Sequence, residues 1–396
     1  MTKAIAMRTT FSLLSLCAIG CSCAPNLALP TGMSCAKQIN AGPTSSSLID
    51  ALSRAERGTC VVAAPAKYTG SFTVPAGVIF GAESGTKVEL IGDNAAKPVI
   101  ALNAGATLTG VRISSAPGVG IASAGGTHLL GVHVESSLGA GIVFWCEEDC
   151  RTGDPAELRD VELTNDAVGL LVHGARVNTF GGKVSGSAGS TLASGYGVVA
   201  SNGAELSMSG TVVEGNEALG LLIDGAQDTS VSLAQVTVQN NKGRGVWAQG
   251  LLGTMGSPRL SLSDCTVAGN KLVGVGAKGS HGLRIQGGTV GSTAIGQAQS
   301  TAGALVPVGD GIGLFGSSGD VQIDSVTINA NERSQVLVDE GSTGLVVQGS
   351  TITQGGGQFG VVVQRTAAVV QAPTITTPPM GQELPISAPT LALPTR

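Results

Sequence analysis

The sequence predicts an all-β solenoid in which a coil of three short strands repeats about ten to twelve times. Two repeated patterns predict this fold. The first is a six-residue phrase with glycine at both ends, found as Gly169-Leu-Leu-Val-His-Gly174, Gly220-Leu-Leu-Ile-Asp-Gly225, Gly245-Val-Trp-Ala-Gln-Gly250, Gly274-Val-Gly-Ala-Lys-Gly279 and Gly311-Ile-Gly-Leu-Phe-Gly316. Self-similarity at a period of roughly 20 to 50 residues is typical of solenoids.

The second pattern consists of pairs of apolar residues with one residue between them, which is the alternation of a β-strand. Two such pairs precede each phrase, as in Val231 and Leu233 followed by Val236 and Val238. Strands this short cannot bury their apolar faces alone, so consecutive coils are expected to stack in parallel, about 4.8 Å apart. Equivalent residues then form columns, and Val238, Val267 and Ile328 are expected to form one buried column.

An asparagine stands four residues before the first residue of the phrase in five coils: Asn165, Asn216, Asn241, Asn270 and Asn331. In the last of these, Gln335 replaces the leading glycine. Asparagine tolerates the left-handed backbone conformation, and its amide can bond to the next amide in a stack. We therefore expect an asparagine column at one corner of the solenoid and glycines at another.

These repeats resemble those of right-handed parallel β-helix repeat proteins, the pectin-lyase-like superfamily that includes pectate lyases, polygalacturonases and alginate epimerases. The resemblance extends over roughly residues 60–365. It implies a single-stranded right-handed parallel β-helix. The segment Val61–Gly70 also resembles the first-coil phrase of many such proteins. We expect the β-helix with its N-terminal cap to occupy residues 44–365.

The N-terminus predicts export. Lys3 and Arg8 precede an apolar run from Phe11 to Ile19, as in a secretory signal peptide. The sequence Ala18-Ile19-Gly20-Cys21 resembles the bacterial lipobox, which implies cleavage before Cys21 and a lipid anchor on that residue. Residues 1–21 would then be the signal peptide, and the protein would lie at the outer membrane or cell surface. Plain secretion, after cleavage near Ala24, is the alternative.

The ends of the domain are also marked in the sequence. Residues 22–43 are rich in small residues and proline and are expected to form a flexible tether. Ser45 or Ser46 is expected to cap a short helix that runs through Leu52 and covers the open end of the solenoid. Residues 366–396 are rich in proline and are expected to form an irregular tail, part of which covers the last coil.

An exported chain can form disulfide bonds. Cys35 and Cys60 would tie the cap to the first coil, and Cys146 and Cys150 would close a short surface loop.

Composition excludes several classes of function. The net charge of −5 offers no basic stripe for nucleic acid. Beyond the N-terminus no apolar stretch reaches a membrane-spanning length, so membrane contact is expected only through the lipid anchor. Aromatic residues form 3% of the chain, which is few for a sugar-binding cleft. No cofactor is expected.

One row of side chains follows from the repeat itself. The residues just before the closing glycines are expected to form a surface row that either grips a ligand or is ordinary solvated surface: Trp145, His173, Asp224, Gln249, Lys278 and Phe315.

Catalytic candidates are sparse. Ser280-His281-Gly282 looks like the Gly-His-Gly segment of polygalacturonases, but the paired carboxylates needed for inverting hydrolysis have no counterpart. Asp224, Asp264, His281 and Arg284 are the candidates for an acid–base set, and they would need to lie on one face. The simpler interpretation of His281 is an ordinary surface residue before a strand.

The one acidic cluster, Glu147, Glu148 and Asp149, offers oxygen ligands of the kind that Ca²⁺ takes. A disulfide-closed, solvated loop is the simpler interpretation of the same residues, and no metal site is predicted.

A well-kept repeat without a convergent catalytic set favours a binding or structural module of the cell envelope over an enzyme. Its partner would be a polysaccharide or a protein at the cell surface. The alternative is a carbohydrate-active enzyme, a lyase, hydrolase or epimerase, acting on an extracellular polysaccharide. Loop insertions mark candidate binding faces at 181–195, 250–258 and 291–309.

Overall fold

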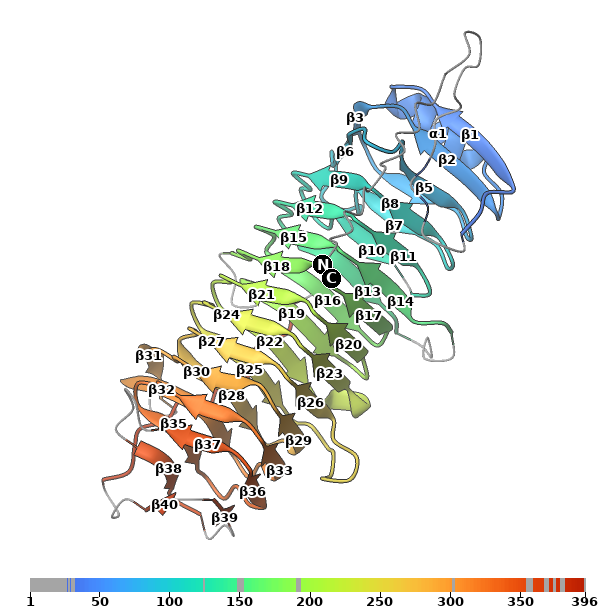
Figure 1. Cartoon of the computed structure of the whole chain (residues 1–396). Coiled ribbons are helices and arrows are strands. Elements are labelled where there is room, and N and C mark those ends of the chain that lie inside the picture. Colours follow the sequence, from blue (N-terminus) through green and yellow to red (C-terminus); the bar gives the residue numbers. More distant parts are fainter. Residues whose placement is uncertain are drawn as a thin grey trace, which may run out of the picture.

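The computed structural model describes residues 27, 29, 33–123, 125–147, 153–189, 194–300, 303–353, 359–366, 370–372, 375–377 and 382–394. The chain winds into a rod in which each coil gives one strand to each of three sheets (Figure 1). Apart from one hairpin, the strands within the sheets pair in parallel. Over the described residues sheet 2 contains twelve strands, so the prediction of ten to twelve coils is confirmed.

We number the sheets in the order in which the chain enters them. Sheet 1 contains, in spatial order, β1 (Lys37–Ala41), β2 (Thr59–Ala63), β5 (Ile79–Ala82), β8 (Thr107–Thr109), β11 (His128–Leu130), β14 (Ala156–Arg159), β17 (Arg176–Phe180), β20 (Glu205–Ser209), β23 (Ser230–Ala234), β26 (Leu260–Ser263), β29 (His281–Gln286), β33 (Gly319–Asp324), β36 (Leu345–Gln348) and β39 (Val370–Gln371).

Sheet 2 contains β3 (Ala66–Thr69), β6 (Val88–Ile91), β9 (Val111–Ser114), β12 (His133–Glu135), β15 (Glu162–Thr164), β18 (Lys183–Ser185), β21 (Val212–Glu214), β24 (Thr237–Gln239), β27 (Thr266–Ala268), β30 (Thr289–Gly291), β34 (Thr327–Asn329) and β37 (Thr351–Thr353).

Sheet 3 contains β4 (Phe72–Val74), β7 (Ile100–Leu102), β10 (Ile121–Ser123), β13 (Ala140–Trp145), β16 (Val168–His173), β19 (Tyr196–Ser201), β22 (Leu219–Asp224), β25 (Arg244–Gln249), β28 (Leu272–Lys278), β32 (Leu305–Phe315), β35 (Ser334–Val338), β38 (Phe359–Val363) and β40 (Ile375–Thr376). The antiparallel hairpin strand β31 (Gly296–Gln299) pairs with β32. A short 3₁₀ turn, η2 (Ala226–Asp228), follows β22.

The interior is a stack of aliphatic columns. Val238 lies beside Val267, which lies beside Val290 and then Ile328, and all four are almost completely buried. The predicted column is therefore confirmed. Stacking buries apolar surface that no single coil could cover, which is the main stabilising contribution in a solenoid.

The asparagine column is a buried amide ladder. The side-chain nitrogen of Asn216 donates to Oδ1 of Asn241 at 2.8 Å, and that of Asn241 donates to Oδ1 of Asn270 at 2.8 Å. Each Oδ1 also accepts the backbone N–H of the residue one coil earlier. At the far end Asn331 donates to Oε1 of Gln335 at 2.7 Å, in its own coil.

Two details of the predicted corner are wrong. The left-handed position is the one before the ladder residue, where Asn240 has a φ of 56°, so Asn241 is not the strained residue. Asn165 also occupies this left-handed position, with a φ of 58°, and the adjacent Asp166 stands in the ladder. The four-residue spacing identified the wrong residue in this coil. Only two residues separate Asp166 from Gly169, one fewer than separate Asn216 from Gly220.

The leading glycines of the phrase are required by close packing against the neighbouring coil, and not by a left-handed backbone conformation. A Cβ on Gly220 would lie 2.6 Å from the carbonyl oxygen of Gly245 and 2.9 Å from the amide nitrogen of Asn241. Real Cβ atoms do not approach backbone this closely, so the ladder amides occupy the space that a side chain would need.

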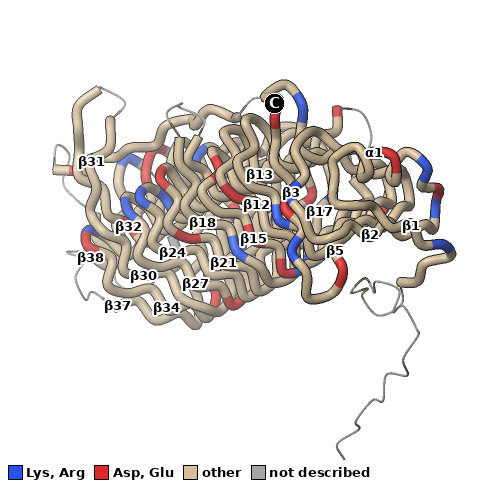
Figure 2. The backbone as a smooth tube through the Cα atoms, turned by 90° about the horizontal axis from the view of Figure 1, so that it is seen from above, with Lys and Arg blue, Asp and Glu red and all other residues tan. Residues whose placement is uncertain are grey.

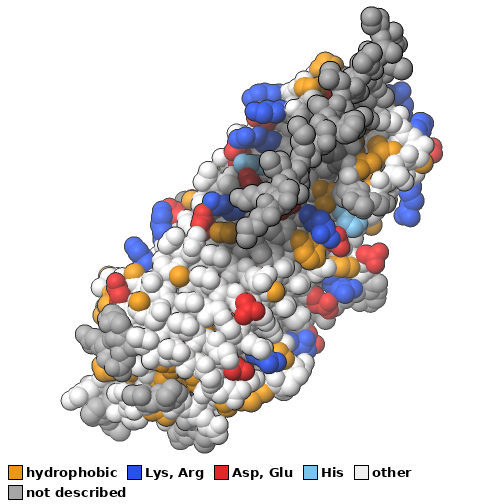
Figure 3. Space-filling view, viewed as in Figure 1, with side chains coloured by type: hydrophobic (Ala, Val, Ile, Leu, Met, Phe, Trp, Pro, Cys, Tyr) orange, Lys and Arg blue, Asp and Glu red, His pale blue; other side chains and the backbone are white. Residues whose placement is uncertain are grey.

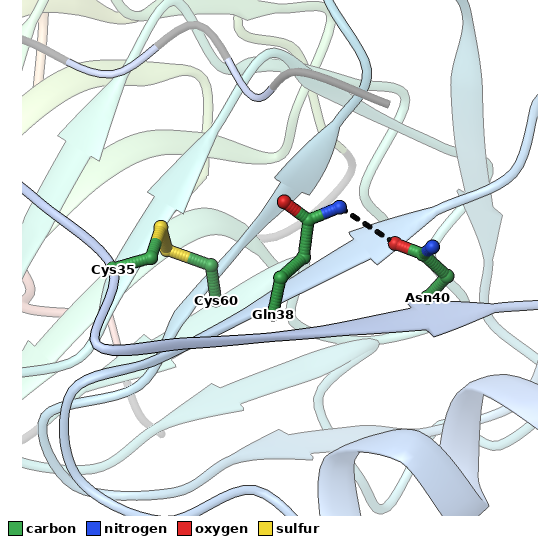
Figure 4. The surroundings of a disulfide bond; sticks show 4 residues. All are labelled: Cys35, Gln38, Asn40 and Cys60. Atoms are coloured by element: carbon green, nitrogen blue, oxygen red, sulfur yellow. Dashed lines mark hydrogen bonds between the residues drawn. A yellow bond between two sulfur atoms is a disulfide. The ribbon is translucent and has the colours of Figure 1, made fainter. Parts of the chain in front are cut away.

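The N-terminal cap differs in detail from the prediction. Helix α1 (Ser45–Ser53) buries Leu48, Ala51 and Leu52, but Thr44 and not a serine provides the N-cap, accepting from the backbone N–H of Ser47 at 3.2 Å. Strand β1 lies within the segment predicted as a tether and pairs with β2. The predicted disulfide between Cys35 and Cys60 is present and fixes this strand to the first coil (Figure 4).

The outward surface of sheet 2 changes along the rod. One outward column is charged in the first coils and then becomes threonine: Lys67, Glu89, Arg112, His133, Glu162, Lys183, Val212, Thr237, Thr266, Thr289, Thr327 and Thr351. Charges of both signs are interspersed along the rod (Figure 2). On the face shown in Figure 3 they gather over the N-terminal half.

Residues 382–394, which we call the C-terminal strap, contain no helix or strand and run back along the outer face of sheet 3. Leu384 contacts Gln364 near the last coil, whereas Leu391 contacts Gln249 in the middle of the rod. The C-terminal end accordingly lies beside the middle of the rod (Figure 1). The segment predicted as an irregular tail, residues 366–396, also contributes the short strands β39 and β40 to sheets 1 and 3, and the strap covers the side of several coils.

Among the helices of the described residues, none has the length and apolar character needed to cross a bilayer.

Candidate functional site

A groove lies on the outer face of sheet 1, across strands β17, β20, β23 and β26, and encloses about 290 Å³. We call it the sheet 1 groove. Its polar lining comes from two columns of residues. The first column contains Arg176, Glu205, Ser230 and Arg259, and the second contains Asn178, Ser207, Ser232 and Ser261.

These columns follow directly from strand alternation. In β23, Val231 and Leu233 point into the rod and are buried, so Ser230 and Ser232 must point outward. The same alternation in β20 and β26 brings Ser207 and Ser261 into line with Ser232, one strand spacing apart. The result is a floor of hydroxyl groups repeated at the coil spacing, about 4.8 Å.

Two loops close the ends of the groove. Pro155 belongs to the loop between β13 and β14, and Pro258 to the loop between β25 and β26. Both segments connect a strand of sheet 3 to the next strand of sheet 1. Arg176 Nη1 donates to the carbonyl oxygen of Gly153 at 3.1 Å, which fixes one of these loops to the groove.

Two ion pairs form the wall of the groove. Arg176 Nε lies 2.9 Å from Glu205 Oε2, and Arg259 Nη2 lies 3.2 Å from Asp228 Oδ1. All four side chains are about a third or more exposed, so these pairs contribute little to stability. Since positive and negative groups are balanced here, the groove suits a polar ligand with many hydroxyl groups better than a strongly charged one.

The four catalytic candidates lie on different elements. Asp224 is at the end of β22 in sheet 3, where its carboxylate accepts from Gln249 Nε2 at 2.8 Å. Asp264 is the left-handed corner residue between β26 and β27, with a φ of 52°, in the column that Gly287 and Gly349 share. Among the described residues, no hydrogen bond or ion pair joins any two of the four candidates.

His281 and Arg284 both lie on β29 in sheet 1. The backbone N–H of His281 donates to the carbonyl oxygen of Leu251 at 2.8 Å, so this residue holds the loop before β26. Arg284 follows Ser261 in the outward column, which places it beside the end of the sheet 1 groove. Its Nε is buried without a hydrogen-bond partner.

The predicted ligand row lies in one register column. Trp145, His173, Asp224, Gln249, Lys278 and Phe315 follow one another from coil to coil, with Ser201 between His173 and Asp224. The row is not a surface row throughout, because Gln249 is 5% exposed and Phe315 is 0% exposed. The sequence did not reveal that the strap covers this part of sheet 3.

The N-terminal end of the row carries an aromatic pair. The rings of Trp145 and His173 stack with centroids 3.9 Å apart, and Trp145 Nε1 donates to Glu147 Oε1 at 3.1 Å. Burial lowers the pKa of His173, and the nearby Glu147 carboxylate opposes this shift. A neutral imidazole on an indole ring offers a flat surface for an apolar or sugar face.

The remaining predicted sites are only partly described. Cys146 is disulfide-bonded, but Cys150, Glu148 and Asp149 lie outside the described residues, as does Cys21. Within the described part of the chain, no cluster of three or more His, Cys, Asp or Glu side chains could hold a metal ion.

The predicted loop insertions lie on two edges of the rod. The loop at 250–258 connects sheet 3 to sheet 1, beside the groove, whereas those within 181–195 and 291–309 connect sheet 2 to sheet 3. The groove residues were not predicted because they stand between the apolar residues of each pair, at positions that do not define the strand pattern. Ser207, Ser232 and Ser261 are those intervening residues, and their repetition was the available signal.

The comparisons with known proteins agree with this architecture. Residues 196–375 match a family model described as the right handed beta helix region. The fold is thus a right-handed parallel β-helix, as the resemblance in the sequence implied. No curated protein sequence matches the chain.

Among solved structures, the A-module of the mannuronan C-5 epimerase AlgE4 of Azotobacter vinelandii is 12% identical, with a TM-score of 0.54 over 84% of this chain and 95% of that one. The AlgE6 A-module of the same organism is 14% identical, with a TM-score of 0.44 over 84% and 93%. The Dettilon tailspike protein is 15% identical, with a TM-score of 0.49 over 80% and 64%. At these identities the likeness concerns the fold.

Proposed function

We propose that this protein is a cell-envelope lipoprotein whose β-helix binds a linear, hydroxyl-rich polysaccharide in the sheet 1 groove, without catalysing a reaction on it. The observation that supports binding is the pair of polar columns that crosses four neighbouring strands between two loops. A ligand with a repeating unit can meet the same hydroxyl group again in each coil, which a single-point site cannot offer.

The chemistry of the lining supports a sugar chain. Serine hydroxyl groups both donate and accept, as sugar hydroxyl groups do. Arg176 and Arg259 are held by carboxylates at the wall and can donate further N–H groups to ring or hydroxyl oxygens. Pro155 and Pro258 supply apolar surface at the two ends of the groove.

The absence of catalysis is proposed because the candidate acids and bases do not converge. Asp224 belongs to sheet 3 and Asp264 to a corner, while His281 and Arg284 belong to sheet 1. General acid–base catalysis needs such groups within hydrogen-bond reach of one reacting bond. The likeness to AlgE4 makes uronate polymers a necessary part of any activity assay.

Binding is tested by a glycan array with the mature protein, followed by titration of the best ligand. Ser232→Leu places an apolar side chain on the groove floor and is expected to weaken binding at least about tenfold, because hydroxyl partners are lost and polar ligand groups are desolvated. Thr266→Leu, on the outward face of sheet 2, is the matched control and should bind normally. Equal binding by both variants would exclude the groove.

Catalysis and anchoring need separate measurements. Incubation with uronate polymers should produce no new reducing ends, no unsaturated products and no epimerised units, and measurable turnover would overturn the non-catalytic proposal. Labelled palmitate should enter the wild-type protein and not the Cys21→Ala variant. Equal label, or none in either protein, would contradict the lipid anchor and leave secretion as the alternative.

A further inference from the structure

The strap is bound to the rod in an unusual way for part of a solenoid. The coils are joined by continuous backbone ladders, yet within the described residues no backbone–backbone hydrogen bond connects residues 382–394 to the rod. Ser387 Oγ donates to the backbone carbonyl oxygen of Gln299. Five rod side chains also make polar contacts with the strap: Arg244, Gln249, Lys278, Arg333 and Gln364. Together with Trp247, we call these six residues the strap site.

Two glutamines recognise the strap backbone at two points each. Gln364 donates from Nε2 to the carbonyl oxygen of Leu384 at 2.8 Å and accepts the N–H of the same residue at 2.9 Å. Gln249 makes the same pair of bonds with Leu391, at 3.1 Å and 2.9 Å. Each glutamine amide therefore takes the place of a neighbouring strand, as in the recognition of an extended peptide.

Apolar contacts lie between these two points. Ile386 and Ala388 are almost fully buried against the outer face of sheet 3, in one cluster with Trp247 and Phe315. A Cβ on Gly276 would lie 2.3 Å from the Trp247 ring, so the glycine allows the indole to lie against the sheet. An aromatic floor beneath a segment with three prolines (Pro385, Pro389 and Pro394) is typical of sites for extended proline-containing peptides.

The strap leaves two donors in its site without acceptors. Arg244 is 7% exposed and lies over the Trp247 ring at 4.6 Å. Among the described residues it donates to the carbonyl oxygen and hydroxyl group of Ser387, while its Nε has no partner. Trp247 Nε1 is also buried without a partner. No carboxylate among the described residues pairs with Arg244, and burial lowers its pKa to about 10.

We propose that the strap site is a recognition site for an extended peptide of a partner protein, and that the strap is its exchangeable occupant within the chain. The preferred partner segment contains proline and carries a carboxylate where the strap has Ser387. A buried guanidinium without a counter-ion is costly, and a carboxylate placed there forms the stronger, charge-assisted hydrogen bonds. The strap backbone satisfies the two glutamines of the site, but Ser387 offers the Arg244 guanidinium only neutral acceptors.

The test uses full-length protein with Ile386→Asp, which removes an apolar anchor of the strap and opens the site. Binding of two labelled peptides is measured by fluorescence anisotropy: the sequence of residues 382–394, and the same peptide with Ser387→Asp. The aspartate loses the bond from Ser387 Oγ to the Gln299 carbonyl oxygen, at 2.9 Å, but gains the guanidinium. It should bind about fivefold more tightly, because charge-assisted bonds are roughly twice as strong as neutral ones.

Arg244→Gln in the same protein is the control variant and should abolish the preference between the two peptides. The wild-type chain, whose own strap occupies the site, should bind both peptides more weakly. The proposal is overturned if the opened protein binds neither peptide, if it binds both equally, or if the preference survives Arg244→Gln.

A second measurement leaves the strap in place. Ser387→Asp in the full-length chain should raise the thermal midpoint and protect residues 382–394 from proteolysis, and Arg244→Gln should cancel both effects. An unchanged or lowered midpoint for Ser387→Asp alone would contradict the proposed role of Arg244.

Discussion

The amide ladder inside the rod has two parts that occupy the same column and differ in chemistry. In the later part, Asn216 and Asn241 each donate a side-chain N–H to the asparagine of the next coil, whereas Asn270 donates back to the carbonyl oxygen of Val238 in the preceding coil. In the earlier part the column reads Ser137, Asp166 and Ser187. There, Oδ1 of Asp166 accepts from the backbone N–H of Ser137 at 2.8 Å, but Oδ2 and both serine hydroxyl groups are buried without partners.

The difference shows why amides suit this column. Only an amide presents an acceptor to one neighbouring coil and a donor to the other, so that each coil satisfies the next. An ionised carboxylate accepts hydrogen bonds but has no hydrogen to donate. Burial consequently raises the pKa of Asp166 to about 7, and the backbone hydrogen bond from Ser137 lowers this shift only in part.

The largest effect is expected from breaking the later part of the ladder. Asn241→Leu removes the acceptor for two N–H groups of Asn216 and the donor to Asn270. We expect a loss of about 4 kcal/mol in the free energy of unfolding, since buried donors left without partners cost about 1 to 3 kcal/mol each. Chemical denaturation measures it. Asp166→Leu is the comparison variant, and an equal or larger loss there would mean that the two parts do not differ.

Repairing the earlier part should stabilise the protein in a pH-dependent manner. The raised pKa of Asp166 means that its contribution to stability is full below about pH 4 and is lost as the pH rises toward 7, because the unfolded state ionises first. Asp166→Asn should therefore add about 2 kcal/mol at pH 8 and much less at pH 4. A gain independent of pH would show that the carboxyl group does not titrate in the folded state.

A smaller gain is expected one coil further on. Ser187→Asn extends the amide ladder by one coil from Asn216, and the glycine that faces it, Gly169, leaves room as Gly197 does for Asn216. We expect about 1 kcal/mol, and more in combination with Asp166→Asn because the two amides would bond to each other. Thermal midpoints of the two single variants and the double variant measure the coupling. Strict additivity would contradict a continuous ladder.

The smallest effect should come from an outward position of the same coil. Thr237 precedes the buried Val238 and projects from sheet 2. Thr237→Ala should change the free energy of unfolding by less than about 0.5 kcal/mol, as is usual for half-exposed sites. A change as large as that of Asn241→Leu would indicate that any substitution in this coil, and not loss of the ladder, destabilises the rod.

The coil could be predicted from the sequence because residues at equivalent positions of successive coils have the same environment and therefore similar side chains. Val238, Val267 and Ile328 meet the same neighbours, so alternation and spacing predicted their column. Asp166 was missed because it performs the role of asparagine with a different side chain, and the neighbouring Asn165 matched the expected spacing. One-residue changes of coil length are invisible to a spacing rule.

The two candidate sites were harder to predict for different reasons. The sheet 1 groove depends on Ser207, Ser232 and Ser261, which have no unusual chemistry individually and matter only in register. The strap could not be predicted because residues 382–394 share no period with the coils that they cover. Contacts such as Gln249 with Leu391 join residues separated by 142 positions, and no local pattern encodes such a pairing.

Gln335 closes the column of ladder residues at its C-terminal end, next to Asn331. It replaces the leading glycine and returns its side-chain amide to Asn331 in its own coil, accepting at 2.7 Å and donating to the carbonyl oxygen at 3.2 Å. Any coil between Asn216 and Asn270 could be duplicated, because the asparagine amide of the copy would have a hydrogen-bond partner in the coil on either side. A coil copied next to Gln335 would find the side-chain amide of Asn331 already hydrogen-bonded to Gln335 within its own coil. Lengthening of this rod by gene duplication is therefore expected to be tolerated in its middle and resisted near its C-terminal end.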